Sequence, residues 1–184
     1  MDLGLFFWRL TRPLKALWHR GFEVGDRFPG FSLTDTHGKN HAVPTKMGDS
    51  WTMLWFTNLC ESCQTKIPLL ADLHNKASGK VQILAISLSG NDKALTDKIA
   101  AQSPFPVLPD PEDIVASKIG LSHPPQTCPF HNLFILDKDR RIVFRHHLSA
   151  MKPEAFRSLW KETGSKSKRA YASAAVVHPK ADPE

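Results

Sequence analysis

Residues 51–70 read WTMLWFTNLCESCQTKIPLL, and the architecture expected for the whole 184-residue chain follows from this segment. Its first six residues are mostly apolar and predict a fully buried strand. Cys60 and Cys63 come next, spaced C-x-x-C, where a helix is expected to begin. Because the unpaired N–H groups and the dipole at a helix start favour a thiolate, C-x-x-C between a strand and a helix is typical of a thiol redox site.

Pro68 lies five residues after Cys63, and the strand, the C-x-x-C and this proline together resemble the thioredoxin superfamily. Other segments are similar to blocks of the TlpA/ResA-like thiol–disulfide oxidoreductases, redoxins related to the AhpC/TSA-type peroxiredoxins. These segments are GDRFPGFSLTD at 25–35, LPD at 108–110, IGL at 119–121 and LFILD at 133–137. The resemblance covers about residues 24–162. It implies an oxidoreductase enzyme with a redox-active disulfide, of the kind that serves cell redox homeostasis and antioxidant defence.

The order of the expected elements, taken with this resemblance, predicts an α/β, thioredoxin-like sandwich. Its central mixed β-sheet is flanked by helices, with an added N-terminal β-hairpin and an N-terminal amphipathic helix. The hairpin strands are expected at 31–34 and 41–43, and the sheet strands at 51–56, 81–88, 107–108, 133–136 and 141–146. Helices are expected at 61–76, from 91 or 92 to 101, at 110–120 and at 153–161, the first of them kinked by Pro68.

Three regions are expected along the chain. Residues 1–20 form a basic amphipathic helix, residues 21–162 the thioredoxin-like domain, and residues 163–184 a disordered tail that is poor in large apolar side chains. Apolar side chains at helical spacing within residues 3–18 favour peripheral contact with an anionic membrane. Packing on the domain, or against another subunit, explains the same pattern equally well.

The net charge of +6 is concentrated at the two ends of the chain. The middle is nearly neutral, which argues against a broad nucleic-acid-binding face. No run of about 18 apolar residues predicts a transmembrane helix, and no clear signal peptide is present. The resemblance nevertheless favours a membrane-associated or extracytoplasmic location, because TlpA-like proteins usually work outside the cytoplasm.

Cys60 is the predicted nucleophile, which attacks a disulfide of a partner protein, and Cys63 resolves the resulting mixed disulfide. An electron-donor protein and no cofactor are expected from the resemblance. Thr57, Glu61 and Lys66 are expected to support the pair. The Glu61 carboxylate opposes a thiolate and the Lys66 cation favours one, so the sign of their combined effect on the reduction potential stays open.

The resemblance also implies a cis-proline loop that faces the cysteine pair. His131 occupies the position where the family has this proline, so Pro129 is the first candidate for the role and Pro125 the second. Cys128 would then come close to Cys60 as a third thiol, either as a second resolving cysteine or as a copper ligand. The plainer reading, a lone cysteine in a loop, is the favoured one.

Two other functions remain open. Thr57-x-x-Cys60 matches part of a peroxiredoxin motif and would make Cys60 a peroxidatic thiol, although Met53 stands where that motif has proline. The motif's arginine would have to be Arg145 or Arg141 in an unexpected geometry. The second alternative is a Sco-like copper chaperone, with Cu(I) bound by Cys60, Cys63 and His131.

Overall fold

The computed structural model of the chain describes residues 21–43, 51–77, 79–88, 92–121, 123 and 128–163. The predicted N-terminal helix, Pro125 and nearly all of the predicted tail lie outside the described residues. Two compact units are distinguished, residues 1–150 and residues 151–184. The second contains helix α6, Pro153–Thr163, which begins at the predicted proline. None of the helices described here is long and apolar enough to cross a membrane.

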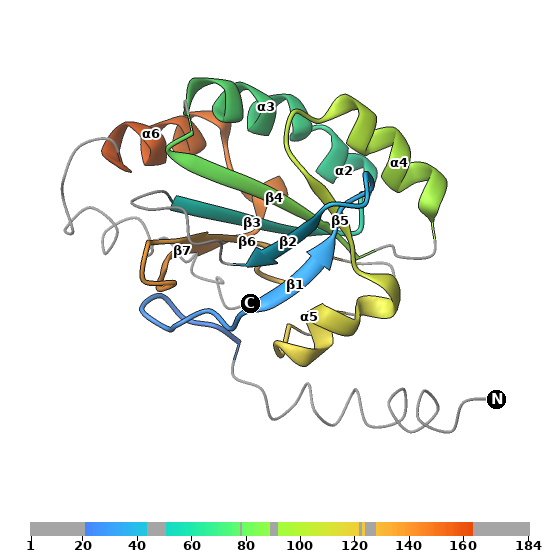
Figure 1. Ribbon diagram of the computed structural model, residues 1–184. Coiled ribbons are helices and arrows are strands. Elements are labelled where there is room, and N and C mark those ends of the chain that lie inside the picture. The colour runs from blue at the N-terminus through green and yellow to red at the C-terminus, as the bar shows by residue number, and fades with distance from the viewer. Residues whose placement is uncertain are drawn as a thin grey trace, which may run out of the picture. The chain divides into compact units, whose positions relative to one another are not determined.

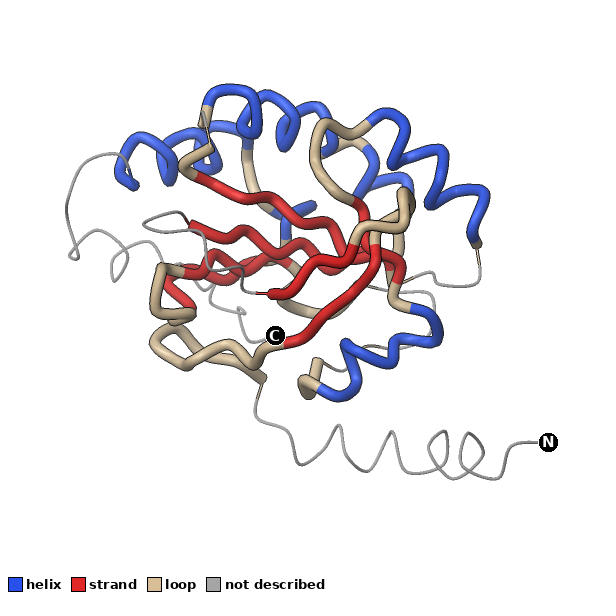
Figure 2. Tube along the Cα trace, viewed as in Figure 1, coloured by secondary structure: helices blue, strands red, loops and turns tan. Residues whose placement is uncertain are grey.

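A five-stranded mixed sheet occupies the centre of the first unit, in the order β5-β4-β3-β6-β7 (Figures 1 and 2). Its strands are β3 Trp51–Thr57, β4 Val81–Ser87, β5 Val107–Pro109, β6 Leu133–Leu136 and β7 Ile142–His146. Strand β4 runs parallel to both β3 and β5, whereas β6 is antiparallel to β3 and to β7. Strands β3 and β4 are buried on both faces, which explains why their sequences are nearly continuous apolar runs.

Alternate side chains of each strand of the sheet point to its two opposite faces. Leu54 and Phe56 of β3 belong to an apolar cluster that also contains Phe28, Phe134 and Ala116. Ala116 comes from α5, Ile114–Lys118, which lies on one side of the sheet, while α3, Ile67–Lys76, and α4, Lys93–Gln102, lie on the other (Figure 1). The predicted architecture, a mixed sheet flanked by helices with an added hairpin, is therefore confirmed for the described residues.

The added hairpin consists of β1, Phe31–Thr34, and β2, Asn40–Val43, which pair antiparallel as a separate two-stranded sheet. Asp35 organises the turn between them. One of its carboxylate oxygens accepts hydrogen bonds from the backbone N–H groups of His37 and Lys39, at 2.8 and 2.9 Å. The other oxygen lies 2.7 Å from Nε2 of His41, whose side chain is buried with that of Asp35.

The segment after the C-x-x-C differs from the single kinked helix that the sequence predicts. Two helices form instead, α2 at Glu61–Gln64 and α3 at Ile67–Lys76. Pro68 lies in the first turn of α3, where its missing N–H would have no helical partner in any case. The proline therefore marks a new helix start rather than a kink.

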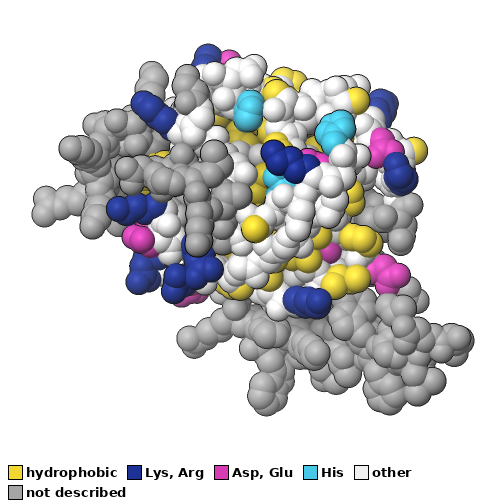
Figure 3. All heavy atoms as spheres, in the orientation of Figure 1, with side chains coloured by type: hydrophobic (Ala, Val, Ile, Leu, Met, Phe, Trp, Pro, Cys, Tyr) yellow, Lys and Arg dark blue, Asp and Glu magenta, His cyan; other side chains and the backbone are white. Residues whose placement is uncertain are grey.

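Of the other two helices of this unit, α4 has nearly its predicted bounds, whereas α5 is shorter than the helix predicted at 110–120. It starts only at Ile114, after Glu112 and Asp113, which both have φ of +56°. Helix α4, Lys93–Gln102, is capped by Asp92, whose carboxylate accepts a hydrogen bond of 3.0 Å from the Leu95 N–H. A short 3₁₀ turn, Pro111–Asp113, precedes α5, and Gly120 follows that helix with φ of +80°. On the face drawn in Figure 3, the described Lys and Arg side chains stand in several separate places beside acidic ones, rather than in one continuous basic surface.

Candidate redox site

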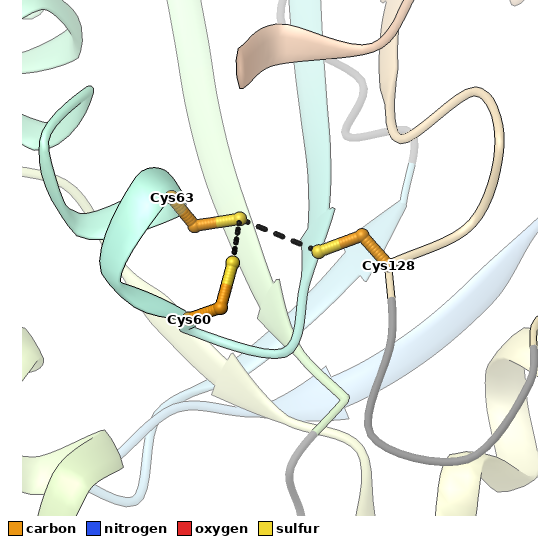
Figure 4. A group of neighbouring side chains, drawn as sticks. All are labelled: Cys60, Cys63 and Cys128. Carbon is orange, nitrogen blue, oxygen red and sulfur yellow. Dashed lines mark hydrogen bonds between the residues drawn. The ribbon is translucent and has the colours of Figure 1, made fainter.

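Three thiols meet beside the carboxyl end of β3 (Figure 4). Cys60 and Cys63 come from the start of α2, and Cys128 comes from the segment that leads into β6. The Sγ atom of Cys63 lies 3.2 Å from that of Cys60 and 3.3 Å from that of Cys128. All three sulfur atoms lie within 4.8 Å of one another, and all three thiols are free. Cys63 therefore has two sulfur neighbours at nearly equal distance.

The turn between β3 and α2 is held by side chains that bond its backbone. The hydroxyl of Thr57 accepts a hydrogen bond from the Leu59 N–H at 3.0 Å, and Asn58 Oδ1 accepts one from the Cys60 N–H at 3.2 Å. Gln64 Nε2 donates to the Leu59 carbonyl at 2.7 Å. Leu59 itself is fully buried with φ of +54°, a left-handed conformation that these contacts must hold in place. These contacts hold Cys60 at the N-cap position of α2.

The three sulfurs differ in their access to solvent. Cys63 is 1% exposed, whereas Cys60 and Cys128 are partly exposed. The sulfur of Cys60 also lies 3.1 Å from the Ser62 hydroxyl. A partner molecule can therefore reach Cys60 and Cys128 from outside, while Cys63 is reached through one of its two sulfur neighbours.

The surroundings of Cys128 favour its charged form. The hydrogen bond with Cys63 is the largest cause that lowers the pKa of Cys128, to about 5, and the Asn58 N–H, 3.4 Å away, acts in the same direction. The side chains of Asn132 and Thr57 add to this effect, and burial opposes it. The same hydrogen bond, together with burial, raises the pKa of Cys63. Either sulfur can donate in this hydrogen bond, and the directions of the two pKa shifts favour Cys63 as the donor.

Asn58 serves Cys128 in both protonation states. When Cys128 is a thiol, it donates to Asn58 Oδ1, which is 3.0 Å away. When it is a thiolate, the backbone N–H of Asn58 is the donor. Sequence reasoning singled out neither Asn58 nor Asn132. The position of Asn58 between the strand and the C-x-x-C was the one available signal.

The other predicted site residues surround this group. Thr57 is fully buried, Glu61 is exposed in the first turn of α2, and Pro129 is buried directly after Cys128. Lys66 is the residue before α3, and Pro68 is exposed on that helix. The opposed effects of Glu61 and Lys66 on the cysteine pair stay predictions, as does the role of Pro129.

Two expectations about Cys128 and His131 need correction. Cys128 is not a lone loop cysteine, because its sulfur contacts that of Cys63. Among the described residues, the group of three or more metal-ligating side chains that the structure brings together is Cys60, Cys63 and Cys128. His131 is not part of it, so the copper set predicted with His131 is not assembled here.

The two arginines considered for a peroxidatic site are engaged elsewhere. Arg145 hydrogen-bonds the Phe22 carbonyl and pairs with the Glu23 carboxylate. Arg141 Nη1 donates to the Gly25 carbonyl at 3.1 Å. Both side chains thus bind the segment at residues 22–25.

Comparison with known proteins places the chain among redox proteins. The model of the AhpC/TSA family matches residues 24–145. The thiol-disulfide oxidoreductase ResA of Geobacillus thermodenitrificans is 25% identical over 144 residues, covering 71% of this chain and 79% of that protein. A peroxiredoxin of Hyperthermus butylicus is 26% identical over 136 residues, covering 66% of this chain and 56% of that protein.

Solved structures show a similar fold. A putative thiol:disulfide interchange protein DsbE from Chlorobium tepidum superposes with a TM-score of 0.61 at 21% identity, covering 79% of this chain and 98% of that one. The thioredoxin domain of a thiol-disulfide oxidoreductase from Bacteroides vulgatus gives a TM-score of 0.62 at 16% identity, covering 77% and 99%. The predicted thioredoxin-like fold is thereby confirmed.

Proposed function

Since the chain belongs to the AhpC/TSA family, we propose that it is a thiol–disulfide oxidoreductase that exchanges a Cys60–Cys63 disulfide with a partner protein. The observation that carries this proposal is the 3.2 Å separation of the two sulfurs, with Cys60 partly exposed and Cys63 buried behind it. A small rotation of either side chain closes the disulfide.

The reaction proceeds in two exchange steps. The Cys60 thiolate attacks a disulfide of the partner, which forms a mixed disulfide and releases one partner thiolate. The Cys63 sulfur then attacks Cys60 Sγ, closes the Cys60–Cys63 disulfide and releases the second partner thiolate, which takes up the Cys63 proton. Two electrons have moved from this protein to its partner. A donor protein resets the pair, and the same steps in reverse oxidise a dithiol.

A protein partner suits the surface beside the site. Phe130 is 83% exposed, two residues after Cys128, and its ring lies 4.7 Å from that of His131. Aromatic side chains are enriched at protein interfaces, where burial of their large apolar surface stabilises a complex. We therefore place the contact with the partner on the segment of residues 128–131.

The test is a redox titration of the Cys128→Ser variant, which keeps only Cys60 and Cys63. Thiol trapping across a dithiothreitol or glutathione series should show one reversible two-electron couple, and the variant should reduce insulin. Adding Cys60→Ser or Cys63→Ser should abolish both. A variant in which Cys60 never pairs with Cys63 would refute the proposal.

A thiol peroxidase is the second candidate, because one relative of this AhpC/TSA-family chain is a peroxiredoxin. In that reaction Cys60 would attack a peroxide and become a sulfenic acid. Arg145 and Arg141 bind residues 22–25, so the positions of these two side chains favour the first candidate. Peroxide turnover by Cys60 with Cys63 left reduced would reverse this order.

A further inference from the structure

Cys63 stands between two accessible sulfurs rather than beside one (Figure 4). Its distances to Cys60 and Cys128, 3.2 and 3.3 Å, differ by too little to select either as the partner for a disulfide. The sequence contains three cysteines, and this group holds all three. A reaction scheme with two of them leaves the third unexplained.

Cys128 has the properties of an attacking thiol. It is partly exposed, as Cys60 is, and the Asn58 N–H points at its sulfur. The thiol of Cys63 supplies a second donor, which lowers the pKa of Cys128. Since the thiolate is the nucleophile in disulfide exchange, these contacts favour attack by Cys128 at neutral pH.

We propose that Cys128 is a second attacking cysteine, and that Cys63 resolves the mixed disulfides formed on either Cys60 or Cys128. This inference rests on the proposed function and extends it. The Cys128 thiolate attacks a partner disulfide, forms a mixed disulfide and releases one partner thiolate. Cys63 then attacks Cys128 Sγ, which closes a Cys63–Cys128 disulfide and releases the second partner thiolate, to which the Cys63 proton goes. The partner gains two electrons, and Cys63 and Cys128 lose two.

The arrangement of the sulfurs makes the two disulfides alternatives. The three sulfurs form a triangle. If they lay on a straight line, the distance between the Cys60 and Cys128 sulfurs would be the sum of their distances to Cys63, but these two sulfurs lie within 4.8 Å of each other. A thiolate attacks a disulfide along the S–S axis, so Cys128 is not aligned to open a Cys60–Cys63 bond. Each disulfide is therefore formed through its own mixed disulfide, and each leaves one thiol free for a further exchange.

Three single-serine variants isolate the three possible pairs. Cys60→Ser leaves Cys63 with Cys128, Cys128→Ser leaves Cys60 with Cys63, and Cys63→Ser leaves Cys60 with Cys128. Each reduced variant is incubated with oxidised glutathione, quenched with acid, alkylated and mapped by mass spectrometry. Trypsin places Cys60 and Cys63 on residues 47–66 and Cys128 on residues 119–138, and a glutamate-specific protease cuts after Glu61 to separate the first two.

We expect C60S to close Cys63–Cys128 at a rate within about tenfold of that for Cys60–Cys63 in C128S, because the sulfur separations are alike. C63S lacks the resolving thiol and should accumulate glutathione on both Cys60 and Cys128. The inference fails if C60S does not form the Cys63–Cys128 disulfide while C128S forms Cys60–Cys63. It also fails if C63S carries glutathione on Cys60 alone.

The same series separates this inference from the function on which it rests. Suppose that C128S forms its disulfide and reduces insulin, whereas C60S neither forms a disulfide nor reduces insulin. The Cys60–Cys63 exchange is then supported and the role of Cys128 is refuted. If C128S stays open while C60S closes, the proposed role of Cys60 is refuted instead. Alanine in place of serine at each position, with circular dichroism of the reduced proteins, shows that any loss comes from the missing sulfur and not from misfolding.

Discussion

At the scale of single residues, the proton between Cys63 and Cys128 controls the chemistry of the site. A thiol that donates to a neighbouring sulfur keeps its own proton and stabilises the neighbour as a thiolate. With the buried Cys63 as the donor, its own pKa is raised, and the pKa of the partly exposed Cys128, the acceptor, is lowered to about 5. Of the two thiols that share this proton, the charged one is therefore Cys128, which is partly exposed.

This sharing of a proton predicts the pH dependence of Cys128 alkylation. In C60S, the rate of reaction of Cys128 with iodoacetamide should change little between pH 6 and 8, because a pKa of about 5 leaves the thiolate dominant throughout. In the C60S/C63A double variant the donor is gone and the Cys128 pKa returns toward the value of 9.0 for an ordinary thiol. Its rate should then rise about tenfold per pH unit over the same range.

The C60S/C63S variant is the matched control, since a serine hydroxyl donates a hydrogen bond at the same place. Its alkylation profile should lie between those of C60S and C60S/C63A. Equal, steep profiles in all three variants would show that Cys63 does not hold the Cys128 thiolate. Mass spectrometry of residues 119–138 assigns the label to Cys128 in each case.

The residue scale is also where prediction from sequence was least complete. Cys60 and Cys63 are recognisable because they are three positions apart and their spacing carries the chemistry. Cys128 lies 65 positions from Cys63, and its contact depends on where the preceding loop delivers the residue before Pro129. No periodicity fixes the course of such a loop, so the lone-cysteine reading was preferred and was wrong.

At the scale of elements, Asp35 shows how one side chain holds the hairpin β1–β2 together. Burial alone would raise the pKa of Asp35. The hydrogen bonds from His41 and from the N–H groups of Lys39 and His37 outweigh burial and lower it. Asp35→Ala removes the acceptor for all three donors and should lower the free energy of unfolding by about 1–3 kcal/mol, measured by urea denaturation.

Asp72→Ala provides the comparison for that measurement. Asp72 pairs with Lys76 one turn along α3, and both side chains are exposed. Removal of such a surface pair should change the free energy of unfolding by about 0.5 kcal/mol or less. If the two variants lost the same stability, the turn contacts of Asp35 would not be what holds the hairpin.

The helices after the cysteines illustrate a limit of element prediction. The sequence identified Pro68 as a disturbance, but a proline is compatible both with a kink and with the first turn of a new helix. In the structure Thr65 is the C-cap residue of α2 and Lys66 is the N-cap residue of α3, so Pro68 lies in the first turn of a new helix. By contrast, β3 and β4 were predicted almost to the residue, because strands buried on both faces are long apolar runs.

At the scale of the molecule, the sheet topology brings the distant thiol to the pair. Strand β6 runs antiparallel to β3, so the start of β6 lies beside the end of β3. The Phe56 N–H donates to the Asn132 carbonyl at 2.8 Å, which joins the two segments just short of the site. The strand order therefore brings the start of β6, and with it the segment that carries Cys128, to the end of β3 that precedes α2.

A thiolate held by the fold links the stability of the reduced protein to pH. The pKa of Cys128 is lowered in the folded state, to about 5, against 9.0 for an ordinary thiol. Between these values the unfolded chain binds a proton that the folded chain does not, so the free energy of unfolding rises with pH. This contribution is complete above pH 9 and is lost as the pH falls to about 5. The Cys63 thiol stays protonated in both states over most of this window, because its folded pKa is raised.

Urea denaturation of the reduced protein at pH 6, 7 and 8 tests this linkage. Wild type should gain stability over C128S by up to about 1.4 kcal/mol per pH unit, the value for one proton. Ser87→Ala is the control, because it removes a buried hydrogen bond to Thr96 that does not titrate, and it should lower stability equally at each pH. Parallel profiles for wild type and C128S would mean that the folded protein does not hold Cys128 as a thiolate. Its role as a second attacking cysteine would then lose its electrostatic basis, and only the distance to Cys63 would remain to support it.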